Sequence, residues 1–325
     1  MILCEGSSFK IEALIHLRPP HMKIPIETPH SFSFKRTALS HGWCQLLPFE
    51  FNQETWTMRR VFDTGEAQPV SVIIKEAASA IEVSIPRGTK LSQHARQKIT
   101  RDVRHIFRLD DDLNEFYEAM SADSGFAWIA RAGAGRMLRA PTIYEDLVKT
   151  ICTTNCSWSL TLKMTAGLTN NLGAHASDGR RDFPTPEAMA AAPLDFYRDE
   201  VRAGYRAPYL KELAERVASG SLDVEGWLHS ELPTAELKQE MKRVKGVGDY
   251  AAENLLKLVG RYDVLALDSW VRGKFARLHN KGRACPDARI ARHYARFNSW
   301  RGLALWCDMT KDWIESATED TEDTE

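Results

Sequence analysis

The stretch Val244-Lys245-Gly246-Val247-Gly248-Asp249-Tyr250-Ala251-Ala252 joins two segments with helical periodicity, 236–243 and 251–259. Two glycines flank one apolar residue, so the backbone can turn sharply while Val247 anchors the turn in the core. Because the glycines have no side chains, a phosphate can approach the backbone of the turn closely. The second helix begins with free N–H groups at the positive end of its dipole. The stretch predicts a helix-hairpin-helix that binds phosphate without reading base sequence. On these residues alone, an ordinary αα-turn with a glycine-rich cap is the alternative.

A single aspartate, Asp268, directly precedes the next predicted helix after this hairpin. Asp268 follows Tyr250 by eighteen residues, between the apolar stretch 264–267 and a helix predicted from Ser269. An aspartate in this place caps the helix, which contributes about 1 kcal/mol. Capping also keeps a carboxylate ionised and fixed, as an electrostatic catalyst requires. We expect Asp268 to fill both roles.

With Asp268 at this spacing, the sequence resembles the helix-hairpin-helix (HhH-GPD) DNA glycosylases, including 3-methyladenine DNA glycosylase II and 8-oxoguanine DNA glycosylase. Three other segments, 136–155, 204–209 and 300–306, resemble family segments in the same order, so the resemblance spans roughly residues 30–314. It implies an α+β fold in which an all-α glycosylase body carries an N-terminal antiparallel β-sheet module. It also implies an enzyme that flips a damaged base out of double-stranded DNA and releases it during base excision repair.

The resemblance assigns roles to individual residues. Asp268 is the expected catalytic residue, which stabilises the positive charge that develops on the sugar. Asn155 is the expected plug against the orphaned base and Tyr205 the intercalating wedge, although a loop-capping Asn and a half-buried Tyr are the plain alternatives. The expected DNA contacts come from residues of the hairpin and of the wedge segment, namely Gly246, Gly248, Tyr250 and Arg206. Arg136, Arg139 and Lys149 are further phosphate candidates, for which solvated surface charge is the alternative.

Tyr250 departs from the pattern of the bifunctional relatives, which carry a lysine at this position. A lysine amine attacks the sugar C1′ to form a Schiff base, and a tyrosine cannot. We therefore expect a monofunctional glycosylase without AP-lyase activity. The alternatives are a bifunctional enzyme with a displaced lysine, for which Lys245 is the nearest candidate, and a non-catalytic helix-hairpin-helix module that only binds DNA.

The expected base pocket is rich in aromatic residues. Asn254 and Trp270 stand at the positions that match a cysteine and a histidine of the 8-oxoguanine enzyme, and Trp306 and Trp43 are further candidates for the pocket wall. Aromatic walls suit electron-poor or cationic alkylated purines through stacking and cation–π attraction. An alkylated purine is therefore the first expectation, and oxidised bases such as 8-oxoguanine or deaminated bases are the alternative. Each tryptophan taken singly is equally well explained as a core residue.

No cofactor is expected to be required. Only Cys285 and Cys307 follow Asp268, so the four-cysteine iron–sulfur cluster of endonuclease III relatives cannot form. Cys152 and Cys156 are four residues apart on one predicted helix. They are interpreted as small core hydrophobes, and a shared metal ion is the alternative. The hairpin geometry suggests that K⁺ or Na⁺ binds backbone carbonyls near Lys242, Val244 and Val247 and bridges to phosphate.

Composition sets the remaining expectations. The chain has 325 residues, 43% of them hydrophobic, with neither a secretory signal nor a long apolar run. We expect a monomer in the cytoplasm (nucleoid-associated) or the nucleus, neither secreted nor membrane-bound. Residues 315–325 carry six acids and no base, which leaves residues 1–314 with a net charge of +5.

The predicted domains are a poorly ordered leader (1–30), a β module (31–90), a helical glycosylase body (91–314) and an acidic disordered tail (315–325). Period-two alternation predicts a strand over 81–85, and apolar periodicity predicts one continuous helix over 142–172.

Overall fold

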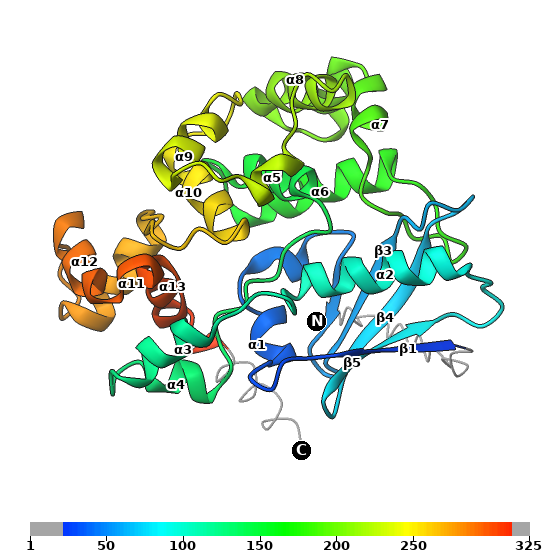
Figure 1. Ribbon diagram of the computed structural model, residues 1–325. Helices are drawn as coiled ribbons and strands as arrows, with labels where there is room; N and C mark the ends of the chain where they lie inside the picture. The colour runs from blue at the N-terminus through cyan, green and yellow to red at the C-terminus, as the bar shows by residue number, and fades with distance from the viewer. Residues whose placement is uncertain (1–21, 314–325) are drawn as a thin grey trace, which may run out of the picture.

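The computed structural model describes residues 22–313, so the predicted tail and residues 1–21 of the predicted leader lie outside the described residues. A sheet, an upper group of helices and a group of helices on the opposite side from the sheet make up the molecule (Figure 1). The described residues form three hydrophobic clusters, which correspond to these three parts. The expected α+β fold with an N-terminal antiparallel sheet is confirmed.

Within residues 22–313 the sheet has five antiparallel strands in the order β1-β5-β4-β3-β2. Their bounds are β1 Met22–Glu27, β2 Glu50–Asn52, β3 Thr57–Phe62, β4 Val70–Ala77 and β5 Ala80–Ile85. The alternation predicted for β5 is confirmed, because Ile81, Val83 and Ile85 are fully buried. Strand β1 corrects the predicted leader: it pairs with β5 along its whole length, so the sheet module begins by residue 22 rather than 31.

The helices follow the sheet along the chain, except for α1, which precedes β2. Their bounds are α1 Phe34–Ala38, α2 Gln93–Ile106, α3 Asn114–Ser121, α4 Ala127–Arg131, α5 Ile143–Thr153, α6 Trp158–Leu172, α7 Pro186–Ala191, α8 Ala207–Ala218, α9 Thr234–Lys242, α10 Asp249–Leu258, α11 Ser269–His279, α12 Asp287–Tyr294 and α13 Arg301–Met309. The single helix predicted over 142–172 is wrong. The chain breaks between α5 and α6, where Asn155 adopts a left-handed φ of 45° that asparagine tolerates better than most residues.

The amphipathic helix α2 lies across one face of the sheet (Figure 1) and shares its hydrophobic cluster. A buried ion pair also joins the sheet to the helical body. Arg60 on β3 donates two hydrogen bonds, of 3.0 and 2.6 Å, to the carboxylate of Glu145 on α5, which also accepts one from Lys149. Removing one partner of a buried pair leaves an uncompensated charge, so this contact holds the two parts in one arrangement.

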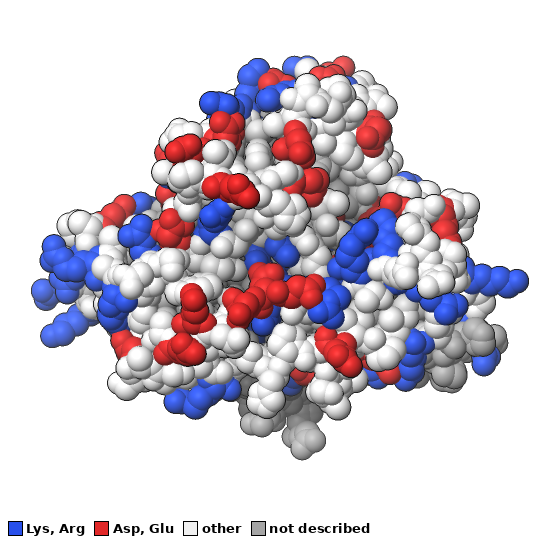
Figure 2. Space-filling model, viewed as in Figure 1, with Lys and Arg blue, Asp and Glu red and all other residues white. Residues whose placement is uncertain are grey.

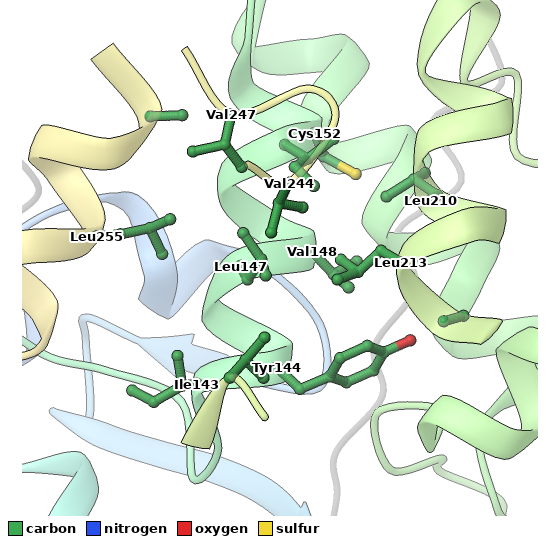
Figure 3. Packing of buried hydrophobic residues seen from close by; sticks show 14 of the residues in the cluster. Ile143, Tyr144, Leu147, Val148, Cys152, Leu210, Leu213, Val244, Val247 and Leu255 are labelled. Carbon is green, nitrogen blue, oxygen red and sulfur yellow. The ribbon is translucent and has the colours of Figure 1, made fainter. Parts of the chain in front are cut away.

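The upper helices pack around α5, as Figure 3 shows. Val244 and Val247 extend from the turn between α9 and α10 toward α5, where Val148 and Cys152 lie. Both valines are almost completely buried. The predicted anchoring of the hairpin by Val247 is thus confirmed, and it fixes the start of α10 relative to the rest of the helical body.

The surface carries no simple charge pattern on the face shown in Figure 2, where basic and acidic side chains are interspersed. That face therefore gives no electrostatic indication of a polyanion path. None of the helices within residues 22–313 combines the length and apolar character that crossing a bilayer requires.

Candidate active site

The hairpin has the geometry that phosphate binding requires. Gly246 has a φ of +89°, and a Cβ added to it would lie 3.0 Å from a ring carbon of Tyr209, so only glycine fits without strain. A Cβ on Gly248 would meet nothing within 4 Å, which means that the space in front of this residue is open. The first backbone bond of α10 runs from the Ala252 amide to the Gly248 carbonyl, so the preceding amides are available to a ligand.

A cavity of about 580 Å³ lies next to this hairpin. It is lined by every predicted pocket residue, namely Trp43, Asn254, Trp270 and Trp306, and by Tyr250 and Asp268. These residues are spread over more than 260 positions of the chain, and the fold brings them to one place. A cavity of this size has the volume of a small-molecule site.

Asp268 is held at the wall of this cavity by the helix that follows it. Its carboxylate accepts a hydrogen bond of 2.6 Å from the Val271 amide, so it caps α11 as predicted. The side chain is half-buried. Burial and the nearby Asp268 carboxylate raise the pKa of the Tyr250 phenol above its usual range, because both disfavour a negative charge on the phenol oxygen.

Tryptophans form much of the cavity wall. The rings of Trp270 and Trp306 have centroids 5.9 Å apart, and Trp313 lies within 6.1 Å of both. Trp306 donates its indole N–H to the Ser40 carbonyl at 2.8 Å, and Trp43 donates to the Asp146 carboxylate at 2.6 Å. These bonds fix the orientation of both rings in the cavity wall.

Sequence reasoning missed two ionisable groups at this site. His41 lines the cavity, and burial lowers its pKa to about 3, so it is neutral and donates its Nε2 proton to the Leu138 carbonyl. Lys257 is fully buried on α10, and its Nζ lies 4.5 Å from the centre of the Trp306 ring. The helical spacing from Tyr250 and Asn254 to residue 257 is the signal that could have indicated the lysine.

The two predicted wedge residues lie together although they are fifty positions apart. The Asn155 amide group lies 3.4 Å from the Tyr205 hydroxyl, and both side chains are exposed. Arg206 must be corrected, because it is buried and unavailable to a phosphate. Its guanidinium donates to the carbonyl and hydroxyl of Thr154 and lies 4.4 Å from the Tyr205 ring centre. Arg206 therefore supports the loop at Thr154 from inside the protein.

The other predicted phosphate partners are also corrected, because all are buried. Arg136 donates to the carbonyls of Arg108 and Asp111, and Arg139 to that of Leu258 at 3.2 Å. Lys149 donates to Glu145 at 2.6 Å. Satisfying backbone carbonyls and a buried carboxylate is a structural role, and it leaves these cations no free donor face toward solvent.

The candidate cysteine pair shows the features of core residues. Cys152 is fully buried, and burial raises the pKa of its thiol to about 12. The Cys156 thiol donates to the Cys152 carbonyl at 3.1 Å. A thiol with a raised pKa is a poor metal ligand, which favours the interpretation as core hydrophobes.

Comparison with solved structures finds close matches to this arrangement. The 3-methyladenine DNA-glycosylase from Archaeoglobus fulgidus superposes with a TM-score of 0.70 over 90% of this chain and 99% of its own, at 19% identity. An 8-oxoguanine glycosylase/lyase of Clostridium acetobutylicum gives a TM-score of 0.68 over 90% and 99%, also at 19% identity. The chain has the fold of the helix-hairpin-helix DNA glycosylases. The resemblance predicted from the motifs is thus confirmed for the fold.

Sequence comparison gives weaker matches. No family model matches the chain. An N-glycosylase/DNA lyase of Saccharomyces cerevisiae is 26% identical over 178 residues, which is 52% of this chain and 45% of the yeast protein. The chain thus spans less than half the length of that relative.

Proposed function

We propose that this protein is a DNA glycosylase that hydrolyses the N-glycosidic bond of a modified purine flipped out of duplex DNA. The observation that carries this proposal is the position of Asp268. Its carboxylate lines a cavity large enough for a base, and the phosphate-binding hairpin leads directly into the helix that forms another wall of the same cavity. A module that only binds the DNA backbone would not require a carboxylate in the wall of an aromatic pocket.

The residues support a dissociative hydrolysis. Breaking the bond between C1′ and the base builds positive charge on the sugar, as in glycoside hydrolysis. Asp268, held by the Val271 amide, stabilises this charge and orients the attacking water. The nucleotide must first leave the stack, and the exposed pair Asn155 and Tyr205 is placed to fill the gap that it leaves.

The proposed enzyme is monofunctional. Tyr250 occupies the hairpin position next to Asp268, and a phenol cannot form a Schiff base. Among the described residues that line the cavity, none is a lysine. The yeast relative is named as a glycosylase and lyase, so borohydride trapping of the enzyme on DNA is the direct test of this difference.

Aromatic walls favour a purine, which offers the larger stacking surface. Our first candidate substrate is an alkylated purine, bound by Trp270 and Trp306. A specific observation favours a second candidate, an oxidised or deaminated purine without positive charge. The Lys257 ammonium already lies over the Trp306 ring, where a cationic base would gain from cation–π attraction.

A panel of duplex oligonucleotides that each carry one modified base tests the proposal. We expect base release from at least one member without alkali, and strand breaks only after alkali. Strand breaks without alkali, together with a borohydride-trapped adduct, would make the enzyme bifunctional. Binding without release from any member, by the wild type and by Asp268→Asn alike, would leave only a non-catalytic DNA-binding module.

Three accompanying proposals concern its surroundings. We propose that K⁺ or Na⁺ binds the carbonyls of Lys242, Val244 and Val247 and bridges to a phosphate; the Val244 carbonyl accepts the Val247 amide at 3.0 Å and retains a second lone pair. Unchanged DNA affinity when potassium is replaced by a bulky organic cation would contradict it. We further propose that the enzyme acts as a monomer, and that it acts inside the cell on nucleoid or nuclear DNA.

A further inference from the structure

A buried amine lies behind the base pocket and has no role in the mechanism described above. Lys257 is on the same side of α10 as Tyr250 and Asn254, which line the cavity, because the three positions follow the spacing i, i+4, i+7. Its side chain is fully buried. No hydrogen-bond partner for its Nζ occurs in the part of the chain that the structure describes.

An arginine holds the backbone of Lys257 in place. The Lys257 carbonyl accepts a hydrogen bond of 2.9 Å from Arg108, which also donates to the carbonyl of Leu258. The Lys257 Nζ lies 4.5 Å from the centre of the Trp306 ring, and Trp306 itself lines the cavity. A buried lysine without a partner is costly, so an unpaired one beside a pocket indicates a role toward what enters it.

Three other titratable side chains face Lys257. Asp268, from the segment before α11, and Glu253, on α10 itself, are the acidic groups that act on the amine, and His41 faces it as a neutral ring. Burial lowers the pKa of Lys257 to about 8, against the opposing effect of Asp268. At neutral pH the Lys257 amine is therefore protonated behind the aromatic wall, while Asp268 lines the cavity itself.

We propose that Lys257 determines substrate choice: its ammonium stabilises the negative charge that a neutral purine acquires as it leaves, and it disfavours purines that are already cationic. This inference rests on the glycosylase function proposed above. It places oxidised or deaminated purines, which are neutral, ahead of the alkylated purine that the aromatic walls alone favour.

The chemistry of the leaving base gives the reason. When the bond from C1′ to the base nitrogen breaks, its electron pair leaves with the base and the sugar becomes positive. Water then adds its hydroxyl group to C1′, and its remaining proton balances the charge on the departed base. A neutral purine passes through an anion in this step, whereas a cationic alkylated purine becomes neutral and needs no positive neighbour. One unit charge at about 6 Å, at an effective dielectric constant near 20, changes the rate roughly 100-fold.

The test compares wild type with Lys257→Met, which keeps the length of the side chain and removes the charge, and with Lys257→Arg, which keeps the charge. Lys75→Met on strand β4 is the matched control, because this exposed lysine pairs only with Glu82 across the sheet. Single-turnover release is measured from duplexes that carry hypoxanthine or 8-oxoguanine as the neutral base, and 7-methylguanine as the cationic base. Thermal melting of each variant checks the fold.

We expect Lys257→Met to lose release of the preferred neutral base by 30- to 100-fold and to keep or increase release of 7-methylguanine. Lys257→Arg and Lys75→Met should stay within about threefold of wild type. For wild type, the rate with the neutral base should fall as the pH rises through 8, since the ammonium is lost, and this fall should be absent in Lys257→Met.

Other outcomes would overturn the inference in distinguishable ways. Equal losses with both kinds of base in Lys257→Met, or faster release of 7-methylguanine than of the neutral bases by wild type, would refute the role of Lys257 and leave the glycosylase intact. A borohydride-trapped adduct that disappears in Lys257→Met would make the lysine a nucleophile instead. No base release by wild type from any duplex would refute the proposed function itself. If Lys257→Met fails to fold, the wild-type preference and its pH profile still decide.

Discussion

Replacement of Asp268 by asparagine tests the proposed chemistry most directly. Asparagine caps a helix as well as aspartate, so Asp268→Asn keeps the hydrogen bond to the Val271 amide and the start of α11. What it removes is one negative charge at the wall of the cavity. At 4–5 Å from the sugar and an effective dielectric constant near 20, that charge contributes about 3–4 kcal/mol to the transition state. The expected loss is therefore roughly 200- to 1000-fold in the rate of base release.

The assay is single-turnover base release from the best member of the oligonucleotide panel, together with binding to the same duplex. Asp287→Asn is the matched control, since Asp287 also opens a helix but lies on the surface, paired with Arg272 at 2.8 Å. We expect Asp268→Asn to bind as wild type does and to release base slowly, and Asp287→Asn to do both normally. Base release by Asp268→Asn within threefold of wild type would refute the electrostatic role of the carboxylate.

Three further predictions concern the hairpin and the protein's pH response. Gly246→Ala should lower the free energy of unfolding by about 1–2 kcal/mol in a denaturant titration because of its positive φ, whereas Gly248→Ala should fold normally and weaken DNA binding in a filter or anisotropy assay. Tyr250→Lys should yield a borohydride-trapped adduct on DNA that wild type does not give. Burial raises the pKa of Asp146 to about 7, so the folded state holds a proton that the unfolded state loses near pH 4. The free energy of unfolding should therefore fall as the pH rises from 4 to 7. At pH 8, Asp146→Asn should regain on the order of 2–4 kcal/mol of this free energy. Equal melting curves of wild type and Asp146→Asn at pH 8 would contradict this.

Local sequence was sufficient to predict the parts of the site that depend on backbone geometry. The turn at Gly246 and Gly248 and the cap at Asp268 are set by residues close in sequence, so their chemistry can be read directly. The strand at 81–85 could also be predicted, because alternation of apolar and polar residues indicates a half-buried strand. The break between α5 and α6 was overlooked although local signals mark it. The polar run Thr153-Thr154-Asn155 interrupts the apolar periodicity, the backbone of Thr154 is extended, and Ser157 caps α6.

Buried charges were the main source of error. Arg136, Arg139 and Arg206 are in basic segments that resemble DNA contacts, yet each donates to backbone carbonyls inside the protein. The partners are as far as 119 positions away in sequence, so no local pattern distinguishes a cation that satisfies a carbonyl from one that faces solvent. The burial of Lys257 has the same origin, because its neighbour Trp306 comes from another helix. Its helical spacing from Tyr250 and Asn254, however, is a local signal that places it on the cavity side of α10.

Helix α10 connects the glycine turn of the hairpin to the inner wall of the cavity. It has 10 residues and is therefore about 15 Å long, with the glycine turn at one end and arginine-capped carbonyls at the other. The carbonyl end is buried and held by these arginines, whereas Gly248, Asp249 and Tyr250 at the other end are exposed. Under the proposed function, the length of this helix sets the distance between a bound phosphate and the inner cavity wall. Adding or deleting one residue would rotate the far end by about 100° relative to the near end. Under the proposed function, substitutions at Tyr250, Asn254 or Leu258, which line the cavity, would change what the pocket accepts without changing this distance.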